Sequence, residues 1–507
     1  MKSSLLLCLA LTSVGVARGA AAETSSSADP RPNGEPSLAE QVQALRHDVA
    51  QMQNDYQKQV AGLTAQVQRQ QALIDSLTVQ VRRPPAAGAP PGPPSPSPAF
   101  PTSDDTLVGS EIATAGPGSK EASSARPSGG ASASGSYLNI SFDAVATLAA
   151  STTANLANLE VGDHDPQQRG FNLRCQELAL SGAVDPYFEG FANVVFKLDN
   201  FNETAVELEE AFLQTTSLPA GLQVRVGQFF APFGRINPTH PHTWDFADTP
   251  LAVGRFLGPD GLRGAGAQVA WLAPWPWYSQ FTVAMQEGRG GTAYSFRNPG
   301  EADGLFFNRP TLDRDVRSLA DFVWVGRWEN SVDLSPTQAV VLGGSLAQGP
   351  NNTSAASSTQ LYGLDLFYKW KPRDAFGGWP FVKWQTEFFW RRYEAGRGAD
   401  NAFPVAEVFH DRGLYTQLIY GFTKGWTAGL RADWLDNGDS SFTDDPTRQD
   451  RTRASAALTW YPTEFSKLRL QFNRDWLRAD TFHTADSANS IFLQTEFMLG
   501  AHGAHKF

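Results

Sequence analysis

Cysteine is almost absent from this sequence. Its 507 residues include only two, Cys8 and Cys175. Cys8 lies in an N-terminal segment with the features of a cleaved export signal, so we expect the mature chain to keep one thiol and to form no internal disulfide. An exported chain of this length without disulfides must rest on a large core or on a closed sheet.

Net positive charge and long apolar runs are also missing. The chain has 41 Lys and Arg against 52 Asp and Glu, a net charge of −11. This balance argues against a nucleic-acid partner, because such proteins normally present a basic face. No run of about 18 apolar residues follows the N-terminal segment, which disfavours a helical membrane protein. A membrane β-barrel remains compatible with the sequence, since each of its strands shows only one face to lipid.

Residues 1–22 are typical of a secretory signal peptide. Lys2 supplies the positive charge, an apolar stretch follows from Leu5 to Val16, and three alanines at 20–22 provide the small residues of a cleavage site. The apolar stretch is too short to span a bilayer and polar sequence follows it. We therefore expect an exported protein.

Residues 37–82 predict a short α-helical coiled coil. Apolar residues recur at spacings of three and four, with one inserted step that relaxes the supercoil locally: Leu38, Val42, Leu45, Val49, Met52, Tyr56, Val60, Leu63, Val67, Ile74, Leu77 and Val81. Such a thin stripe implies self-association; the alternative is a single amphipathic helix docked elsewhere. Residues 83–136, rich in Pro, Ala, Ser and Gly, predict a semi-extended linker.

From residue 137 to residue 507 the pattern predicts an all-β fold, a transmembrane antiparallel β-barrel of about sixteen strands. In the first strand Leu138, Ile140 and Leu148 face one way, while Ser141 and Asp143 face the other. Further strands are expected near 170–184, 187–199, 205–216, 222–230, 265–274, 277–286, 319–328, 338–348, 359–371, 379–392, 412–422, 425–435, 451–461, 467–477 and 490–500.

The connections between these strands alternate between short and long, apart from a brief one near 200–204. Outer-membrane barrels have short periplasmic turns and long external loops. This asymmetry predicts an outer-membrane location in contact with lipid, with both ends of the barrel, and hence the coiled coil, in the periplasm. Aromatic residues such as Trp275, Trp328 and Trp460 lie near strand ends, where a girdle at the membrane interfaces is expected.

The connection 231–264 is the third external loop and holds the candidate functional residues. It is rich in turn-forming residues, so it should fold on itself. The candidates for a pore constriction are the charged residues of this loop: Arg235, Asp245, Asp248, Arg255, Asp260 and Arg263.

The text Val226-Gly-Gln-Phe-Phe-Ala-Pro-Phe-Gly234 at the start of this loop, with the length and layout of the chain, resembles the phosphate-selective porin O and P family. The resemblance covers roughly residues 137–507. It implies a homotrimeric channel whose third loop forms a constriction lined by basic side chains, so that small hydrophilic solutes or ions, including anions such as phosphate, would diffuse through it.

Charge alone leaves the selectivity open. Residues 137–507 hold 31 Lys and Arg against 41 Asp and Glu, so no basic bias is visible. The loop arginines could supply fixed positive charge at a constriction. The loop aspartates could instead pair with them and leave a nearly neutral aperture.

His240 and His242 are weak candidates for a metal site. Two imidazoles two residues apart on an extended segment point the same way and could share a borderline metal with Asp245. The favoured interpretation is that Pro238, Pro241 and the histidines only shape a rigid loop, and no cofactor is expected.

Three other functions are alternatives to a diffusion channel. An outer-membrane enzyme would need a nucleophile with a histidine partner, and no G-x-S-x-G element is present, so the chain is not expected to be an enzyme. The second alternative is a structural tether whose helical arm binds the cell wall or a periplasmic partner; conductance in planar bilayers would discriminate it from a channel. A TonB-dependent receptor is disfavoured, because its larger barrel and plug would not fit in about 370 residues.

Overall fold

The computed structural model describes residues 138–199, 201–298, 305–307, 309–396, 406–438, 448–477 and 487–500. The chain divides into two units, Met1–Ser103 and Asp104–Phe507, and only the second contains described residues. The expected signal peptide, coiled coil and linker, together with the C-terminal Gly/His tail, lie outside the described residues. None of the described helices is long and apolar enough to cross a membrane.

Sixteen antiparallel strands form one closed barrel, which confirms the expected fold class and strand number. The barrel strands are β1 (Leu138–Ser151), β2 (Gly170–Ala183), β3 (Phe188–Leu198), β4 (Thr204–Thr215), β5 (Leu222–Phe230), β6 (Arg263–Leu272), β7 (Tyr278–Gln286), β10 (Val323–Ser335), β11 (Gln338–Pro350), β12 (Ser358–Trp370), β13 (Phe381–Ala395), β14 (Glu407–Thr423), β15 (Trp426–Asp436), β16 (Arg451–Thr463), β17 (Ser466–Leu477) and β18 (Ser487–Gly500). Each strand pairs with its neighbours in the chain, and β1 closes the barrel on β18 from Ser141–Gly500 to Ser151–Ser490.

The remaining elements lie in the connections. They are the helix α2 (Leu251–Leu257), the short pair β8 (Leu305–Phe306) and β9 (Arg309–Pro310), and five 3₁₀ turns: η1 (Leu156–Asn158), η2 (Pro219–Gly221), η3 (Pro241–Thr243), η4 (Gly291–Ala293) and η5 (Leu319–Asp321). The strand expected at 319–328 begins only at Val323, because Ser318 caps a 3₁₀ turn at 319–321 and thereby delays the ladder.

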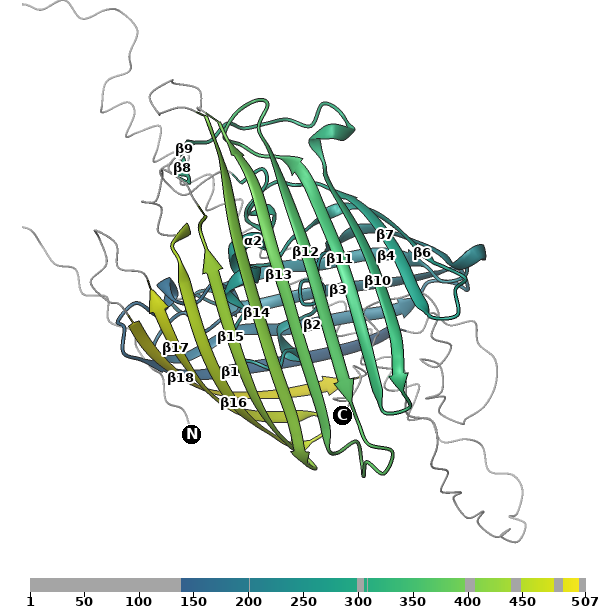
Figure 1. Cartoon of the computed structure of the whole chain (residues 1–507), viewed down its shortest axis with the longest axis vertical. Helices are drawn as coiled ribbons and strands as arrows, with labels where there is room; N and C mark the ends of the chain where they lie inside the picture. The colour runs from purple at the N-terminus through teal and green to yellow at the C-terminus, as the bar shows by residue number, and fades with distance from the viewer. Residues whose placement is uncertain are drawn as a thin grey trace, which may run out of the picture. The chain divides into compact units, whose positions relative to one another are not determined.

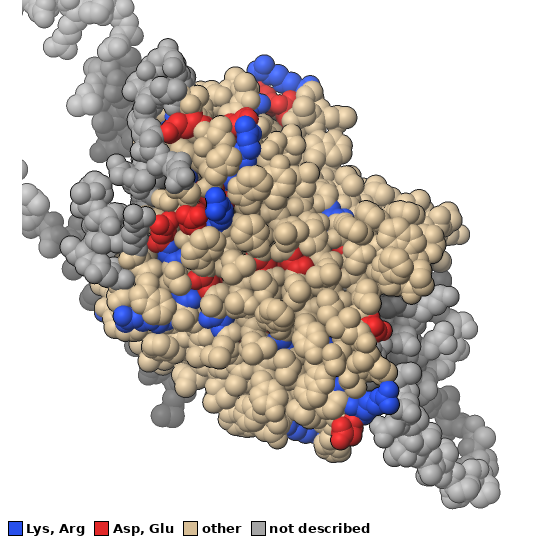
Figure 2. Space-filling model, in the orientation of Figure 1, with Lys and Arg blue, Asp and Glu red and all other residues tan. Residues whose placement is uncertain are grey.

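Side chains alternate between the two faces of the wall with the period of a strand. In β17 the buried, inward residues are Lys467, Arg469, Gln471, Asn473 and Asp475, whereas the exposed, outward residues are Leu468, Leu470, Phe472 and Trp476. Figure 2 shows one outer face, on which most of the area between the strand ends carries neither acidic nor basic residues. Such a wall has its apolar side toward lipid and its polar side toward the lumen.

The connections also follow the expected asymmetry. On one side of the barrel they are short, as at 424–425 and 464–465, and on the other they include the long segments 152–169, 231–262 and 287–322. Two connections depart from the expectation: 351–357, on the long side, has only seven residues, and 371–380, on the short side, has ten. The third long-side connection, residues 231–262, is called the third loop below.

We predict that arginine on the outward face will destabilise the barrel according to its depth. Leu364, at the middle of β12, and Leu334, at the turn end of β10, are 65% and 60% exposed. Leu364→Arg should cost about 2–4 kcal/mol and Leu334→Arg about 0–1 kcal/mol, because the charge is desolvated only near the bilayer centre. Urea unfolding in lipid vesicles measures both values; equal costs would contradict a membrane-spanning wall.

Candidate pore constriction

The third loop runs inside the barrel and contacts walls far apart around its circumference. The backbone N–H groups of Arg235 and Ile236 donate to Glu387 of β13, each at 2.9 Å. Further along, Ala247 N donates to Gln471 Oε1 of β17 at 2.7 Å. Since these wall side chains point into the lumen, the loop lies within it.

The start of the third loop explains the motif at 226–234. Phe229 and Phe233 are fully buried, and Gly234 has a φ of +64°, a conformation that favours glycine. A Cβ on Gly234 would lie 2.2 Å from Glu387 Oε2. A larger residue at position 234 would be strained by this φ and would have to displace the Glu387 carboxylate, so glycine is favoured in the turn that leads the loop into the lumen.

Part of the barrel interior is apolar. All seven residues of α2 are buried, and Phe256 stacks on Phe389 of β13 with ring centroids 5.7 Å apart. The helix lies against β13, β14 and β15, behind the front wall in Figure 1. The barrel interior is thus only partly polar, because the third loop brings its own hydrophobic core into it.

Two of the three candidate arginines, Arg255 and Arg263, are buried, and Arg235 is half-buried. Arg235 lies with its guanidinium carbon 3.9 Å from the ring centre of Phe367. The Arg255 guanidinium donates to the carbonyl of Gln449, and burial lowers the pKa of Arg255 to about 10. Arg263, the first residue of β6, pairs with Glu207 of β4. Of the three, Arg263 has a carboxylate partner, whereas Arg235 contacts an aromatic ring and Arg255 a backbone carbonyl.

The candidate aspartates pair mainly with the wall. Asp248 contacts Arg431 of β15 at 2.9 Å and Arg453 of β16 at 2.5 Å. Burial would raise the pKa of Asp248, but these two arginines lower it. Asp245 accepts from Lys383 Nζ at 2.8 Å.

Pairing between candidates of opposite charge within the loop is limited. Asp260 and Arg263 form one such pair, at 3.9 Å, and burial raises the pKa of Asp260. The alternative in which loop aspartates neutralise loop arginines therefore holds only weakly. Charge compensation instead runs from the loop to the wall.

The two histidines point to the same wall, as their spacing suggested. Their rings stack with centroids 5.7 Å apart, and both contact Glu177 of β2, His240 at 3.3 Å and His242 at 3.1 Å. Burial would lower the pKa of His240, but the charges of Glu177 and Glu209 raise it well above its usual value. Asp245, the third ligand considered from sequence, pairs with Lys383 instead.

Sequence reasoning missed the glutamates of β4. The pairing of β3 with β4 shifts between Asn193–Glu210 and Val194–Leu208, which leaves Glu209 as an extra residue in a bulge. A bulge re-aims a side chain, and both Glu209 and Glu210 are buried and contact His240. The available signal was the break in alternation where two glutamates follow Leu208.

Inward charges are segregated around the barrel. The acidic wall comprises Asp143, Glu177, Glu207, Glu209 and Glu210 of β1, β2 and β4, with Arg174 and Lys197 as the nearby bases. The basic wall comprises Arg431, Arg451, Arg453, Lys467 and Arg469 of β15–β17, with Asp433 and Asp475 among them. The third loop reaches both walls, with its histidines on the first and Asp248 on the second.

A closed, even-numbered antiparallel barrel with an apolar exterior, a charged interior and an inserted third loop defines a β-barrel of the outer-membrane type. The chain is 31% identical over 359 residues to a protein of Aquifex aeolicus (strain VF5) described as "Uncharacterized protein", which covers 67% of this chain and 71% of the relative. The chain belongs to the same family as that protein. No protein-family model matches the chain.

Two solved structures are similar in chain course. The outer membrane channel DcaP of Acinetobacter baumannii has a TM-score of 0.47 and 11% identity, over 73% of this chain and 99% of that one. The outer membrane protein OmpT of Vibrio cholerae, in its trimer form, has a TM-score of 0.42 and 9% identity, over 72% and 99%.

We predict that Asp248→Ala will be strongly destabilising, by about 3–5 kcal/mol, because it leaves two buried arginines without their shared partner. Asp245→Ala is the matched control: the pair with Lys383 is partly exposed, so its loss should cost about 1 kcal/mol or less. Urea unfolding of the detergent-folded protein measures the difference. Similar values for the two variants would contradict this account of Asp248.

Proposed function

We propose that this protein is an outer-membrane porin, a channel through which small hydrophilic solutes or ions diffuse passively. The observation that carries the proposal is the position of the third loop inside a closed barrel, where it contacts β13 through Ile236 and β17 through Ala247. A loop held across the lumen narrows the path and sets its diameter and charge. The wall supplies the rigid frame, and the loop is the constriction.

Partly exposed charges inside the barrel favour cations over phosphate. Asp163, Glu207 and Asp260 keep 24%, 23% and 19% of their side-chain surface exposed, against 16% for the nearby Lys197. Lys383 is 25% exposed, but it pairs with Asp245, which is 20% exposed. Charges that still touch solvent act on a passing ion, whereas fully paired buried charges largely cancel. Arg263 belongs to the second group and Arg255 is buried against a backbone carbonyl, so an anion path built on them is the less favoured form of this proposal.

We further propose that the protein is a member of the phosphate-selective porin O and P family and that it assembles into a homotrimer. What supports the first is the role of the motif at 226–234, whose Gly234 turns the loop toward Glu387. The trimer rests on that resemblance. Chemical cross-linking of the protein in native membranes would test it, with a ladder that ends at three chains as the expected result.

Shortening the third loop should raise the conductance. Ala231 N donates to the carbonyl of Leu262 at 2.8 Å, so the two ends of the loop already lie in hairpin register, and Asn-Gly can replace residues 232–261. Single-channel conductance in planar bilayers should increase severalfold, because the obstruction is gone.

A deletion of residues 315–320 is the control for the shortened loop. These residues lie in the connection between β7 and β10, and most are exposed. Their removal should leave the conductance unchanged. If both variants conduct like the parent, the third loop does not limit the path.

Neutralising the exposed acids should shift the selectivity toward anions. The double variant Glu207→Gln, Asp260→Asn removes two negative charges, so the reversal potential in a salt gradient should move in the direction of anion permeability. Glu464→Gln, in the exposed turn between β16 and β17, is the control and should not move it. An unchanged reversal potential in the double variant would rule out these acids as selectivity determinants.

A further inference from the structure

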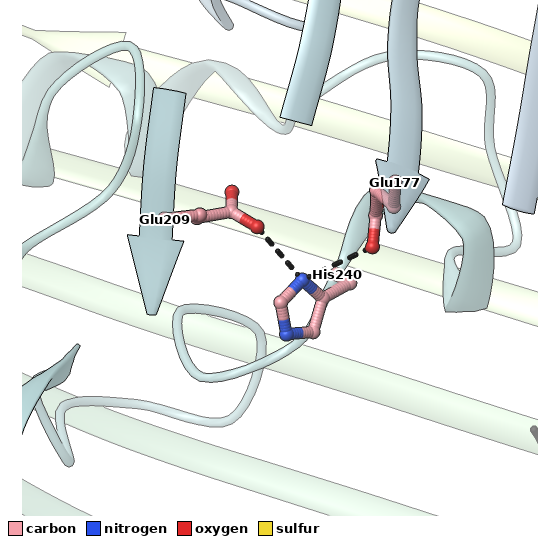
Figure 3. Close-up of side chains that lie close together, drawn as sticks. All are labelled: Glu177, Glu209 and His240. Atoms are coloured by element: carbon pink, nitrogen blue, oxygen red, sulfur yellow. Dashed lines mark ion pairs between the residues drawn. The ribbon is translucent and has the colours of Figure 1, made fainter. Parts of the chain in front are cut away.

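Four side chains from three strands and the third loop meet at one point inside the barrel: Glu177 of β2, Asn193 of β3, Glu209 of β4 and His240. His240 Nδ1 lies 2.9 Å from Glu209 Oε2 and 3.3 Å from Glu177 Oε2 (Figure 3). Asn193 Nδ2 lies 2.8 Å from Glu209 Oε2, 3.2 Å from Glu177 Oε2 and 3.0 Å from His240 Nδ1. The His240 and Asn193 nitrogens therefore lie within hydrogen-bonding distance of each other and of one oxygen of each glutamate.

While both glutamates are ionised, no placement of the His240 Nδ1 proton turns every one of these contacts into a matched hydrogen bond. If His240 Nδ1 carries a proton, it can donate to Glu209 Oε2, but it then lies 3.0 Å from the Asn193 amide nitrogen, a second donor to the same oxygen. If Nδ1 is bare, its lone pair faces two carboxylate oxygens, acceptor against acceptor. Buried polar groups normally have matched partners. A cation at the centre would satisfy all of them.

We propose that Glu177, Glu209, His240 and Asn193 bind a divalent transition-metal ion of the Zn²⁺ type. Bonds of about 2.0–2.2 Å to such an ion separate its tetrahedral ligands by about 3.3–3.6 Å, and the contacts of 2.8–3.3 Å require only a slight opening. Two carboxylates and one imidazole are a donor set that suits Zn²⁺, Co²⁺ or Mn²⁺ better than a hard ion such as Ca²⁺. The site does not depend on whether the protein is a channel.

The fourth ligand is the side-chain oxygen of Asn193. This residue is 1% exposed, and among the described residues no hydrogen-bond partner lies within reach of its Oδ1. The oxygen and nitrogen of an asparagine amide exchange places by a half-turn of the side chain. That half-turn puts Oδ1 between the two carboxylates, a place that an oxygen can occupy only beside a cation.

Surrounding side chains hold the ligands as they do in metalloproteins. His240 Nε2 lies 3.1 Å from Glu210 Oε2, so this nitrogen can donate to the carboxylate and leave the Nδ1 lone pair for the ion, the arrangement common around metal-bound imidazoles. Glu177 accepts from Cys175 Sγ on Oε1 at 3.0 Å and lies 3.1 Å from His242 Nδ1 through Oε2. These two contacts fix the orientation of the Glu177 carboxylate.

The position of the site gives the ion a structural role. Glu177 and Glu209 are each 2% exposed and His240 is 14% exposed, so the ion would enter past the histidine. Once bound, it would join the acidic wall to the third loop. Hydrogen exchange of residues 236–246 should therefore slow when Zn²⁺ is added to chelator-treated protein.

Zinc and cobalt titrations of the detergent-folded, chelator-treated full-length protein test the proposal. We expect one tightly held Zn²⁺ per chain, and a visible absorption band on Co²⁺ addition that Zn²⁺ abolishes. Glu210→Ala should weaken Zn²⁺ binding by about 10–100-fold, as loss of an outer partner does. His240→Ala and Glu209→Gln should weaken it more.

Substitutions of histidines outside the proposed site serve as controls. His410→Ala, on β14 beside Trp390, and the paired variant His502→Gln, His505→Gln should bind Zn²⁺ like the parent. The proposal is overturned if the parent binds no more Zn²⁺ than His240→Ala does, which would leave a proton on one glutamate as the explanation of the short contacts.

Two variants of Asn193 test whether this side chain is a metal ligand or only a hydrogen-bond donor. Asn193→Asp keeps a ligand oxygen, so it should retain Zn²⁺ and show a larger Zn²⁺-dependent rise in thermal midpoint than the parent, because three carboxylates repel one another without the ion. Asn193→Leu should lose the site. Equal Zn²⁺ affinity in Asn193→Leu and the parent would remove Asn193 from the ligand set.

Discussion

The closure of the sheet is the constraint on which the rest of this structure depends. A strand in hydrocarbon has no water to satisfy its N–H and C=O groups, so every edge must be paired, and only a closed barrel leaves no edge. Here β1 and β18 provide that closure, although 338 residues separate Ser151 from the chain segment beside it. Once the wall is closed, each strand has one lipid face and one inner face, and the apolar and polar halves of its sequence are assigned accordingly.

The inner face of the closed wall, however, buries charged side chains that need partners. Residues such as Arg453 and Asp475 are completely buried, and a buried charge without a partner is strongly destabilising. The wall solves this partly by pairs between neighbouring strands, as between Arg453 and Asp475 at 2.9 Å. The connections supply further partners: Glu160 of the connection 152–169 pairs with Arg453, and the third loop carries Asp248 and the two histidines to the basic and acidic walls. The loop is therefore a part of the electrostatic balance of the barrel, and its position follows from the charges around it.

Packing and charge act together on that loop. The apolar cluster around Phe233, Phe256 and Phe389 holds its first turn and its helix against β11–β15, while the polar contacts fix its other side. A segment anchored on several walls has few alternative positions, so the third loop has a defined place inside the barrel. The metal site inferred at His240 would add a further anchor, in a stretch of the loop whose side chains are mostly half-exposed.

The order of strands and the asymmetry of their connections were readable from the sequence, because alternation with a period of two is a local property that each strand carries by itself. Strand bounds such as those of β2 and β17 lie within a few residues of the expected ones, and the third loop was recognised from its length and its turn residues. The partners of the candidate residues were not readable. Asp248 pairs with Arg431, 183 residues away, and Glu209 meets His240 only because a bulge turns it inward. Those contacts depend on how the closed wall brings distant strands around one loop. The spacing of residues along the chain does not predict such an arrangement.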